Sequence, residues 1–108
     1  MQINMKGTRL SLKPAVKEYI QKKMDMLEKY LGEVPVISAN FELELTTRHH
    51  VKGEIYRAEA SLVVPHDLLR VEKTEADMFK AIDKVKDHLR RSIKRYKEKM
   101  IDKKRKTV

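Results

Sequence analysis

The chain has 108 residues and a mass of 12.8 kDa, and 41% of its residues are hydrophobic, which is enough apolar material for one compact domain but not for two. No apolar run approaches the roughly 18 to 20 residues of a membrane span, and the N-terminus lacks the apolar core of a signal peptide. We therefore expect neither a membrane-spanning nor a secreted protein. The sequence has no cysteine, which excludes disulfides and thiol chemistry and is compatible with a reducing, cytoplasmic setting.

The positive charge is concentrated at the C-terminal end. The chain carries a net charge of +9, with a pI near 9.8. Residues 1–87 hold 15 basic and 14 acidic side chains, whereas residues 88–108 hold 10 basic side chains against Glu98 and Asp102. Such an excess favours a polyanionic partner, either nucleic acid or an acidic membrane surface. The alternative is that these cations only solvate a terminal helix.

The N-terminal segment predicts a short strand followed by a helix. Ile3 and Met5 alternate with polar neighbours, as in a strand with one buried face, and a break at Gly7-Thr8 is expected to follow this strand. A helix follows, with Ser11 as its N-cap and Pro14 in its first turn. Apolar residues recur at helical spacing until Gly32: Val16, Ile20, Met24, Leu27 and Leu31.

Three strands are predicted next, joined by short connections. Residues 37–46 and 56–64 alternate between apolar and polar side chains and form a hairpin around the polar tip 47–53. A turn at 65–67 leads to a shorter fourth strand at 69–72. Because the connections are short, we expect these three strands to be consecutive and antiparallel.

A second helix is predicted from Glu75 to about Met100. It has a single apolar stripe, with acidic residues early and basic residues late, as the helix dipole favours. Residues 102–108 are expected to be a basic, disordered tail behind a domain of residues 1–101. The order βαβββα predicts an α+β fold, a two-layer sandwich with two helices packed on one face of a four-stranded sheet.

One flank of this second helix carries a row of basic residues. At about 100° per residue they form a continuous stripe beside the buried seam, positioned where it can face a groove between the two helices. Lys23, with Tyr19, Met26 and Tyr30 nearby, can contribute from the first helix. Cations one helical turn apart neutralise successive phosphates, so the stripe predicts shape-selective RNA binding without base readout. Its members are Lys84, His88, Arg91, Arg95 and Lys99.

Other surfaces and chemistries find little support. The outer sheet face presents charged residues such as Glu42, Glu44 and Arg57, where an RRM needs aromatic side chains. Glycine-rich phosphate loops, nucleophile elbows and HExxH spacings are missing, so we expect no enzyme, metal, cofactor or small-molecule substrate. The adjacent residues His49 and His50 are predicted to lie in a solvated loop tip.

Two sequence patterns carry a resemblance to a known family. The first is an acidic turn followed by Asp-Met-aromatic, Ala-Ile and a basic helix. It covers residues 71–83 (VEKTEADMFKAID) and continues through Leu89, Arg91, Lys94, Arg95 and Lys97. The second combines residues 14–16, Lys23 and the run 27–30. On these patterns, residues 1–100 resemble the ribosome hibernation promoting factors, also called ribosome-associated inhibitors or sigma-54 modulation proteins.

The resemblance implies a βαβββα domain that binds the small ribosomal subunit and its RNA near the decoding centre. There it would occlude the mRNA and tRNA sites and reversibly inhibit translation under stress or in stationary phase, in the cytoplasm. Basic residues on both helices contact ribosomal RNA in the family. Position 88, often Lys in relatives, is His here, so its charge depends on pH. The predicted RNA-binding residues are Lys23, Lys29, Lys84, His88, Arg91, Lys94, Arg95 and Lys99.

Two questions stay open at the level of sequence. The chain resembles the short form of the family, so it either holds single ribosomes inactive or pairs them with the help of a separate ribosome modulation factor. The alternative function is a protein-interaction module whose basic helix docks an acidic partner, such as a sigma-54 transcription component.

Overall fold

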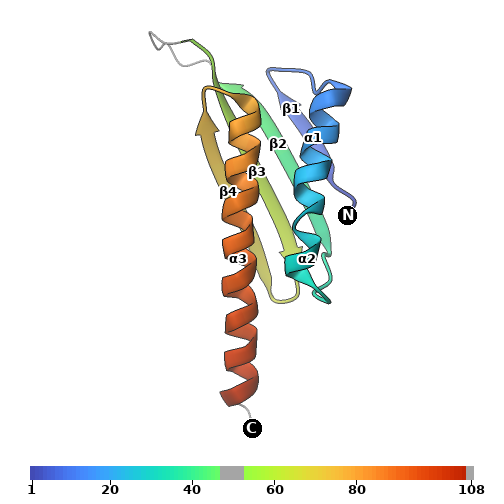
Figure 1. Ribbon diagram of the computed structural model, residues 1–108, viewed down its shortest axis with the longest axis vertical. Coiled ribbons are helices and arrows are strands. Elements are labelled where there is room, and N and C mark those ends of the chain that lie inside the picture. Colours follow the sequence, from blue (N-terminus) through green and yellow to red (C-terminus); the bar gives the residue numbers. More distant parts are fainter. Residues whose placement is uncertain (47–52, 107–108) are drawn as a thin grey trace.

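The computed structural model describes residues 1–46 and 53–106, without the side chains of residues 104–106. Its strands form one sheet in the order β1-β2-β3-β4, with β1 parallel to β2 and the other pairs antiparallel. The helices cover one face of this sheet, with α1 and α2 beside β1 and β2 and α3 over β3 and β4 (Figure 1). The predicted two-layer α+β architecture is confirmed. The elements are β1 (Asn4–Thr8), α1 (Pro14–Asp25), α2 (Glu28–Leu31), β2 (Ser38–Thr46), β3 (Ile55–Val64), β4 (Asp67–Glu75) and α3 (Met78–Lys106).

The core lies between the sheet and the helices. Phe41 and Leu43 of β2 point inward together with Leu62 of β3, and all three are fully buried. They meet the apolar stripes of the helices, represented by Ile20 and Leu89. Burying one side chain of this size stabilises the fold by roughly 1.5 to 3 kcal/mol, so the period-two and period-3.6 patterns together fix the two layers.

The first strand is longer than its sequence suggests. The predicted break at Gly7-Thr8 is wrong, because both residues pair with β2 and the chain turns only at Arg9, whose φ is 61°. Gly7 is required by a close approach: a Cβ atom there would lie 2.5 Å from the carbonyl oxygen of Leu10. Thr8 then donates a hydrogen bond to Glu42 across the sheet.

The first helix is interrupted. The expectation of one helix from Ser11 to Leu31 is wrong, because α1 begins at Pro14 without a side-chain cap and ends at Asp25. At the break, the N–H of Leu27 bonds to the carbonyl of Met24 at 3.0 Å, a tighter turn than an α-helix makes. This turn buries Leu27 completely, and α2 follows it.

The hairpins differ from prediction at their ends. Ile37 precedes β2 and is 67% exposed, so its assignment to the buried row is wrong. β4 is longer than expected, since it pairs with β3 along its full length from Asp67 to Glu75. The turn between them uses Pro65 and His66, whose φ of 67° suits the second central position of a type II turn. The tip with His49 and His50 lies outside the described residues.

The last helix is the longest element. Asp77 caps it by accepting hydrogen bonds from the N–H groups of Phe79 and Lys80, at 2.8 and 3.2 Å. Its expected end near Met100 is wrong, because α3 continues to Lys106 and so includes residues 102–106 of the expected disordered tail. A 29-residue helix spans about 43 Å, against about 33 Å for a ten-residue strand, so its C-terminal part projects beyond the sheet (Figure 1). Within the described part of the chain, none of the helices has the length and apolar character to cross a membrane.

Candidate nucleic-acid interface

The basic residues of α3 lie on two flanks of the helix. One flank faces β4, and we call it the β4 flank. Lys84 is placed there by an ion pair of 2.7 Å with Glu75 of β4, and Arg95 lines a hollow together with Asp67 and Arg70 of the same strand. The β4 flank consists of Lys84, His88, Arg95 and Lys99 of α3 with Lys73 of β4.

The other flank faces α2, and we call it the α2 flank. Lys97 donates a hydrogen bond of 2.9 Å to the carbonyl oxygen of Tyr30. The charged ends of Lys29 and Arg90 lie 5.1 and 5.6 Å from the centre of the Tyr30 ring. A hollow of about 570 Å³ lies between the two helices on this side. The α2 flank consists of Arg90, Lys94 and Lys97 of α3 with Lys29 of α2.

The predicted stripe does not face a groove between the helices, so this expectation is wrong. Of its members, Lys84, His88, Arg95 and Lys99 lie on the β4 flank, and Arg91 lines hollows on both sides and forms the crest between them. The helical wheel places the stripe beside the buried seam, but both sides of a seam look alike in sequence. Only the packing of α3 against β4 decides on which side of the seam the stripe lies.

Two of the predicted RNA-binding residues are held in internal ion pairs. Lys23 lies 3.2 Å from Asp83 and is 22% exposed. Lys84 pairs with Glu75. Within the described residues, no carboxylate partner is found for the other predicted cations. This uncompensated set consists of Lys29, Arg91, Lys94, Arg95 and Lys99, and it moves the centre of positive charge to α2 and the second half of α3.

The surroundings of His88 disfavour its charged form in the free protein. Its Nδ1 atom is buried and has no hydrogen-bond partner among the described residues. Burial lowers its pKa below 6.5, and the nearby charges of Lys73, Arg91 and Arg95 lower it further. A phosphate close to His88 would favour the protonated form, so this position can gain charge on binding.

Sequence reasoning missed part of the surface. Arg90 and Lys97 line the α2 flank, and Lys73 reaches the β4 flank from the sheet. The spacing of Arg90, Lys94 and Lys97, four and then three residues apart, signals a second helical stripe in the sequence. No sequence signal placed Lys73 beside α3, because that contact depends on the packing of β4.

The outer sheet face has a different electrostatic character. Arg57 bonds to Glu42 and Glu44, each at 2.7 Å, and lies 3.3 Å from Glu59. Glu59 also binds Arg70 at 2.8 Å. These outward side chains neutralise one another where a sheet-based RNA platform would present aromatic rings. Positive charge is therefore in excess on the helix layer and not on the sheet.

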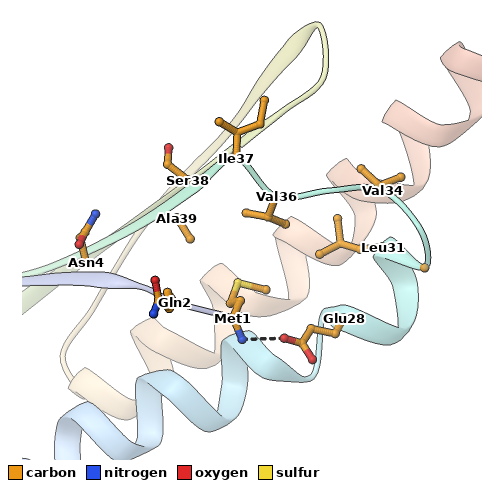
Figure 2. A pocket seen from close by; sticks show the side chains of 11 residues that line it. Met1, Gln2, Asn4, Glu28, Leu31, Val34, Val36, Ile37, Ser38 and Ala39 are labelled. Atoms are coloured by element: carbon orange, nitrogen blue, oxygen red, sulfur yellow. Dashed lines mark hydrogen bonds and ion pairs between the residues drawn. The ribbon is translucent and has the colours of Figure 1, made fainter.

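Another hollow lies away from both flanks, and no lysine, arginine or histidine is among its described lining residues. It measures about 630 Å³ and lies between the N-terminus, α2 and the start of β2, with Leu31, Val36 and Ala39 in its wall (Figure 2). The Met1 amine lies beside it, bonded to Glu28 at 2.6 Å and to Asp25 at 3.0 Å, and its pKa is raised by these carboxylates. Among the described residues, no cluster of three or more His, Cys, Asp or Glu side chains can hold a metal ion.

A basic helical surface on a βαβββα sandwich defines a class of α+β domains suited to polyanions. The chain belongs to the family described as Sigma 54 modulation protein / S30EA ribosomal protein, which matches residues 3–101. This confirms the resemblance drawn from the sequence.

Curated relatives carry names that refer to the ribosome. The ribosome hibernation promotion factor of Lactococcus lactis subsp. cremoris is 30% identical over all of this chain and 56% of its own length. That of Deinococcus radiodurans is 31% identical over 90% of this chain and 50% of its own length. The chain thus spans about half the length of the curated relatives that it matches. These names describe the hibernation of ribosomes and not a catalysed reaction.

Solved structures share the fold. The Protein Y N-terminal domain from Thermus thermophilus superimposes with a TM-score of 0.76 and 31% identity, covering 89% of this chain and 99% of that one. A ribosomal subunit interface protein from Coxiella burnetii gives the same TM-score at 19% identity, covering 91% of this chain and 99% of the other, and supports the fold alone.

Proposed function

We propose that this domain binds the small ribosomal subunit through its RNA, near the decoding centre, and reversibly inhibits translation by occluding the mRNA and tRNA sites. The observation that carries the proposal is the uncompensated set of cations on α2 and the second half of α3. Family membership directs it to the ribosome. A role of this kind in stress or stationary phase implies a cytoplasmic location.

The physical basis is the release of counterions from RNA. Each cation that neutralises a phosphate makes the slope of log affinity against log salt more negative by about 0.7 to 0.9. The crest residue Arg91 and its neighbour Arg95 are both exposed, so their removal leaves the core intact. Replacing both with alanine is expected to weaken binding and to reduce the magnitude of the slope by roughly 1.4 to 1.8.

The test is co-sedimentation of the purified protein with small subunits and whole ribosomes, at low and high salt, with translation measured in parallel. R91A/R95A is compared with K6A/K17A, which removes the same charge from the outer sheet face and from α1, where both lysines are exposed. Circular dichroism checks that both variants fold. We expect wild type and K6A/K17A to co-migrate and to inhibit, and R91A/R95A to lose both properties at moderate salt.

The outcomes separate the alternatives. An equal loss of binding and inhibition in both variants would show that binding depends only on the total charge and not on this surface. Absence of the wild type from every ribosomal fraction at low salt would reject the proposal, and capture of an acidic protein that survives nuclease treatment would then favour the interaction-module alternative. That alternative is not favoured, since it depends on the sigma-54 name alone. A disome peak in this mixture would show that the protein pairs ribosomes without an added modulation factor.

A further inference from the structure

The hollow on the α2 flank combines cations with an aromatic ring. Its volume is about 570 Å³, and its wall includes the ring of Tyr30 and the side chain of Ile101, which is 50% exposed. Lys29, Lys94 and Lys97 surround this apolar part, and Glu98 is its one acidic lining residue among those described. In Figure 1, α2 lies alongside the middle of α3, and the hollow is lined by residues of both helices.

Arg90 connects the apolar and the charged parts of this hollow. Its guanidinium carbon lies 5.6 Å from the centre of the Tyr30 ring, and the side chain remains exposed. A hydrogen bond with Arg90 and the charge of Lys29 lower the pKa of Tyr30. Arginine planes and aromatic rings are the surfaces on which unpaired nucleobases stack.

The β4 flank has no comparable stacking surface among its described residues. Tyr96 lines the hollow beside Arg95 and Lys99 but is only 5% exposed, and its hydroxyl is bonded to the carbonyl oxygen of Pro65 at 2.7 Å. Arg95 on this flank has no accessible aromatic ring beneath it, so the flank lacks the arginine-on-ring platform that Arg90 and Tyr30 form. The two flanks therefore differ in the chemistry that they offer to RNA.

We propose that the hollow on the α2 flank takes one unpaired nucleotide of the bound RNA. Its base stacks on Arg90 above Tyr30, and its flanking phosphates lie among Lys29, Lys94 and Lys97. The bases of double-stranded RNA are stacked inside the helix and do not reach this surface, so the hollow distinguishes loops and single strands from duplex. This inference depends on the proposed function for its RNA, and it adds which kind of RNA segment the α2 flank recognises.

The test compares two synthetic RNA stem-loops that carry the same phosphates. One has a loop of normal adenosines, and the other has abasic sugars at the same loop positions. We expect the wild type to bind the normal loop roughly tenfold more tightly than the abasic loop, as stacking of one base predicts. R90K keeps the positive charge but lacks the planar guanidinium group on which a base can stack. The preference should therefore fall to about twofold or less. R95K is the matched control on the β4 flank and should keep the full preference.

Equal affinity of the wild type for the two loops, or a preference that R90K leaves unchanged, would overturn the inference. Co-sedimentation of the wild type with small subunits is measured on the same samples. Wild-type protein that binds small subunits but shows no preference for the normal loop would leave the proposed function intact and reject the stacking site.

Discussion

The hydroxyl of Tyr19 donates a hydrogen bond of 2.6 Å to Oδ1 of Asp83, which links α1 to the first turns of α3. The same oxygen lies 3.2 Å from Nζ of Lys23, and the ring of Tyr19 meets Phe79 edge-on at 4.8 Å. The carboxylate thus holds two side chains of α1 at once. Lys23 of α1 is paired with this carboxylate in the free protein. This distinguishes it from the uncompensated cations on α2 and α3.

Removing the Tyr19 hydroxyl should destabilise the fold modestly. Y19F is expected to lower the free energy of unfolding by about 1 kcal/mol, the net worth of one hydrogen bond, or somewhat more because the acceptor is charged. The hydrogen bond to Asp83 raises the pKa of Tyr19 to about 12. Its stabilisation is therefore complete below pH 10 and is lost as pH rises from 10 to 12. Ultraviolet titration of the wild type should show a tyrosine that ionises at about pH 12 and that Y19F lacks, and an unchanged titration would contradict the assignment.

Arg57 should be the most important charged residue for stability. It is 18% exposed and holds Glu42 and Glu44 on the outer sheet face, so R57A leaves these carboxylates beside each other without a cation. We expect a loss of about 2 kcal/mol at pH 7, measured by urea unfolding. R70A is the control, because Arg70 is 62% exposed and should contribute under about 1 kcal/mol. Similar losses in the two variants would show that the network adds nothing to single surface pairs.

The cost of removing Arg57 should depend on pH. The pKa of Glu42 is lowered by the hydrogen bond from Thr8 and by Arg57. A lowered carboxylate pKa stabilises the folded state above the unfolded value of 4.5, and this stabilisation is lost as pH falls through the folded pKa. The difference between wild type and R57A should therefore shrink as pH falls below 4.5. A difference that persists undiminished there would assign the effect to lost packing of the arginine stem.

Freeing Lys84 should strengthen RNA binding. Glu75 neutralises it at 2.7 Å in the free protein. E75Q is expected to raise affinity for small subunits about twofold to fivefold at low salt and to increase the magnitude of the salt slope by about 0.7 to 0.9. K84A alone should have a smaller effect than R91A, because Lys84 must first leave its partner. If E75Q bound no better than wild type, Lys84 would lie outside the RNA footprint.

Binding should tighten as pH falls below 7, and His88 should be the cause. Burial and neighbouring cations lower its pKa in the free protein, and an RNA phosphate favours its charged form, so binding takes up a proton. H88Q removes the titrating group and should flatten the pH dependence between about pH 7 and pH 5. H88K places a cation at this position and should flatten the dependence while raising affinity at pH 7. A pH response that survives in H88Q would assign the proton to another group.

The sequence determined the layers of this protein. Alternation in β2 and β3 and the period-3.6 stripe of α3 identify inward side chains such as Phe41, Leu62 and Ile93, because only one arrangement buries all of them at once. It also located the charge, since the basic excess after residue 87 lies on a helix whichever way that helix packs. The element order and the family resemblance follow from the same patterns.

The tertiary structure decided which charges remain available and where they point. Lys23 and Lys84 look like the other cations of the sequence, but Asp83 and Glu75 neutralise them from elements that pattern analysis cannot bring together. The flank of α3 that meets β4, and the Tyr30 ring beneath Arg90, likewise depend on how α2 and β4 pack against the helix. Spacing along one helix fixes the angle between its side chains, but only packing against its neighbours fixes what each side chain meets.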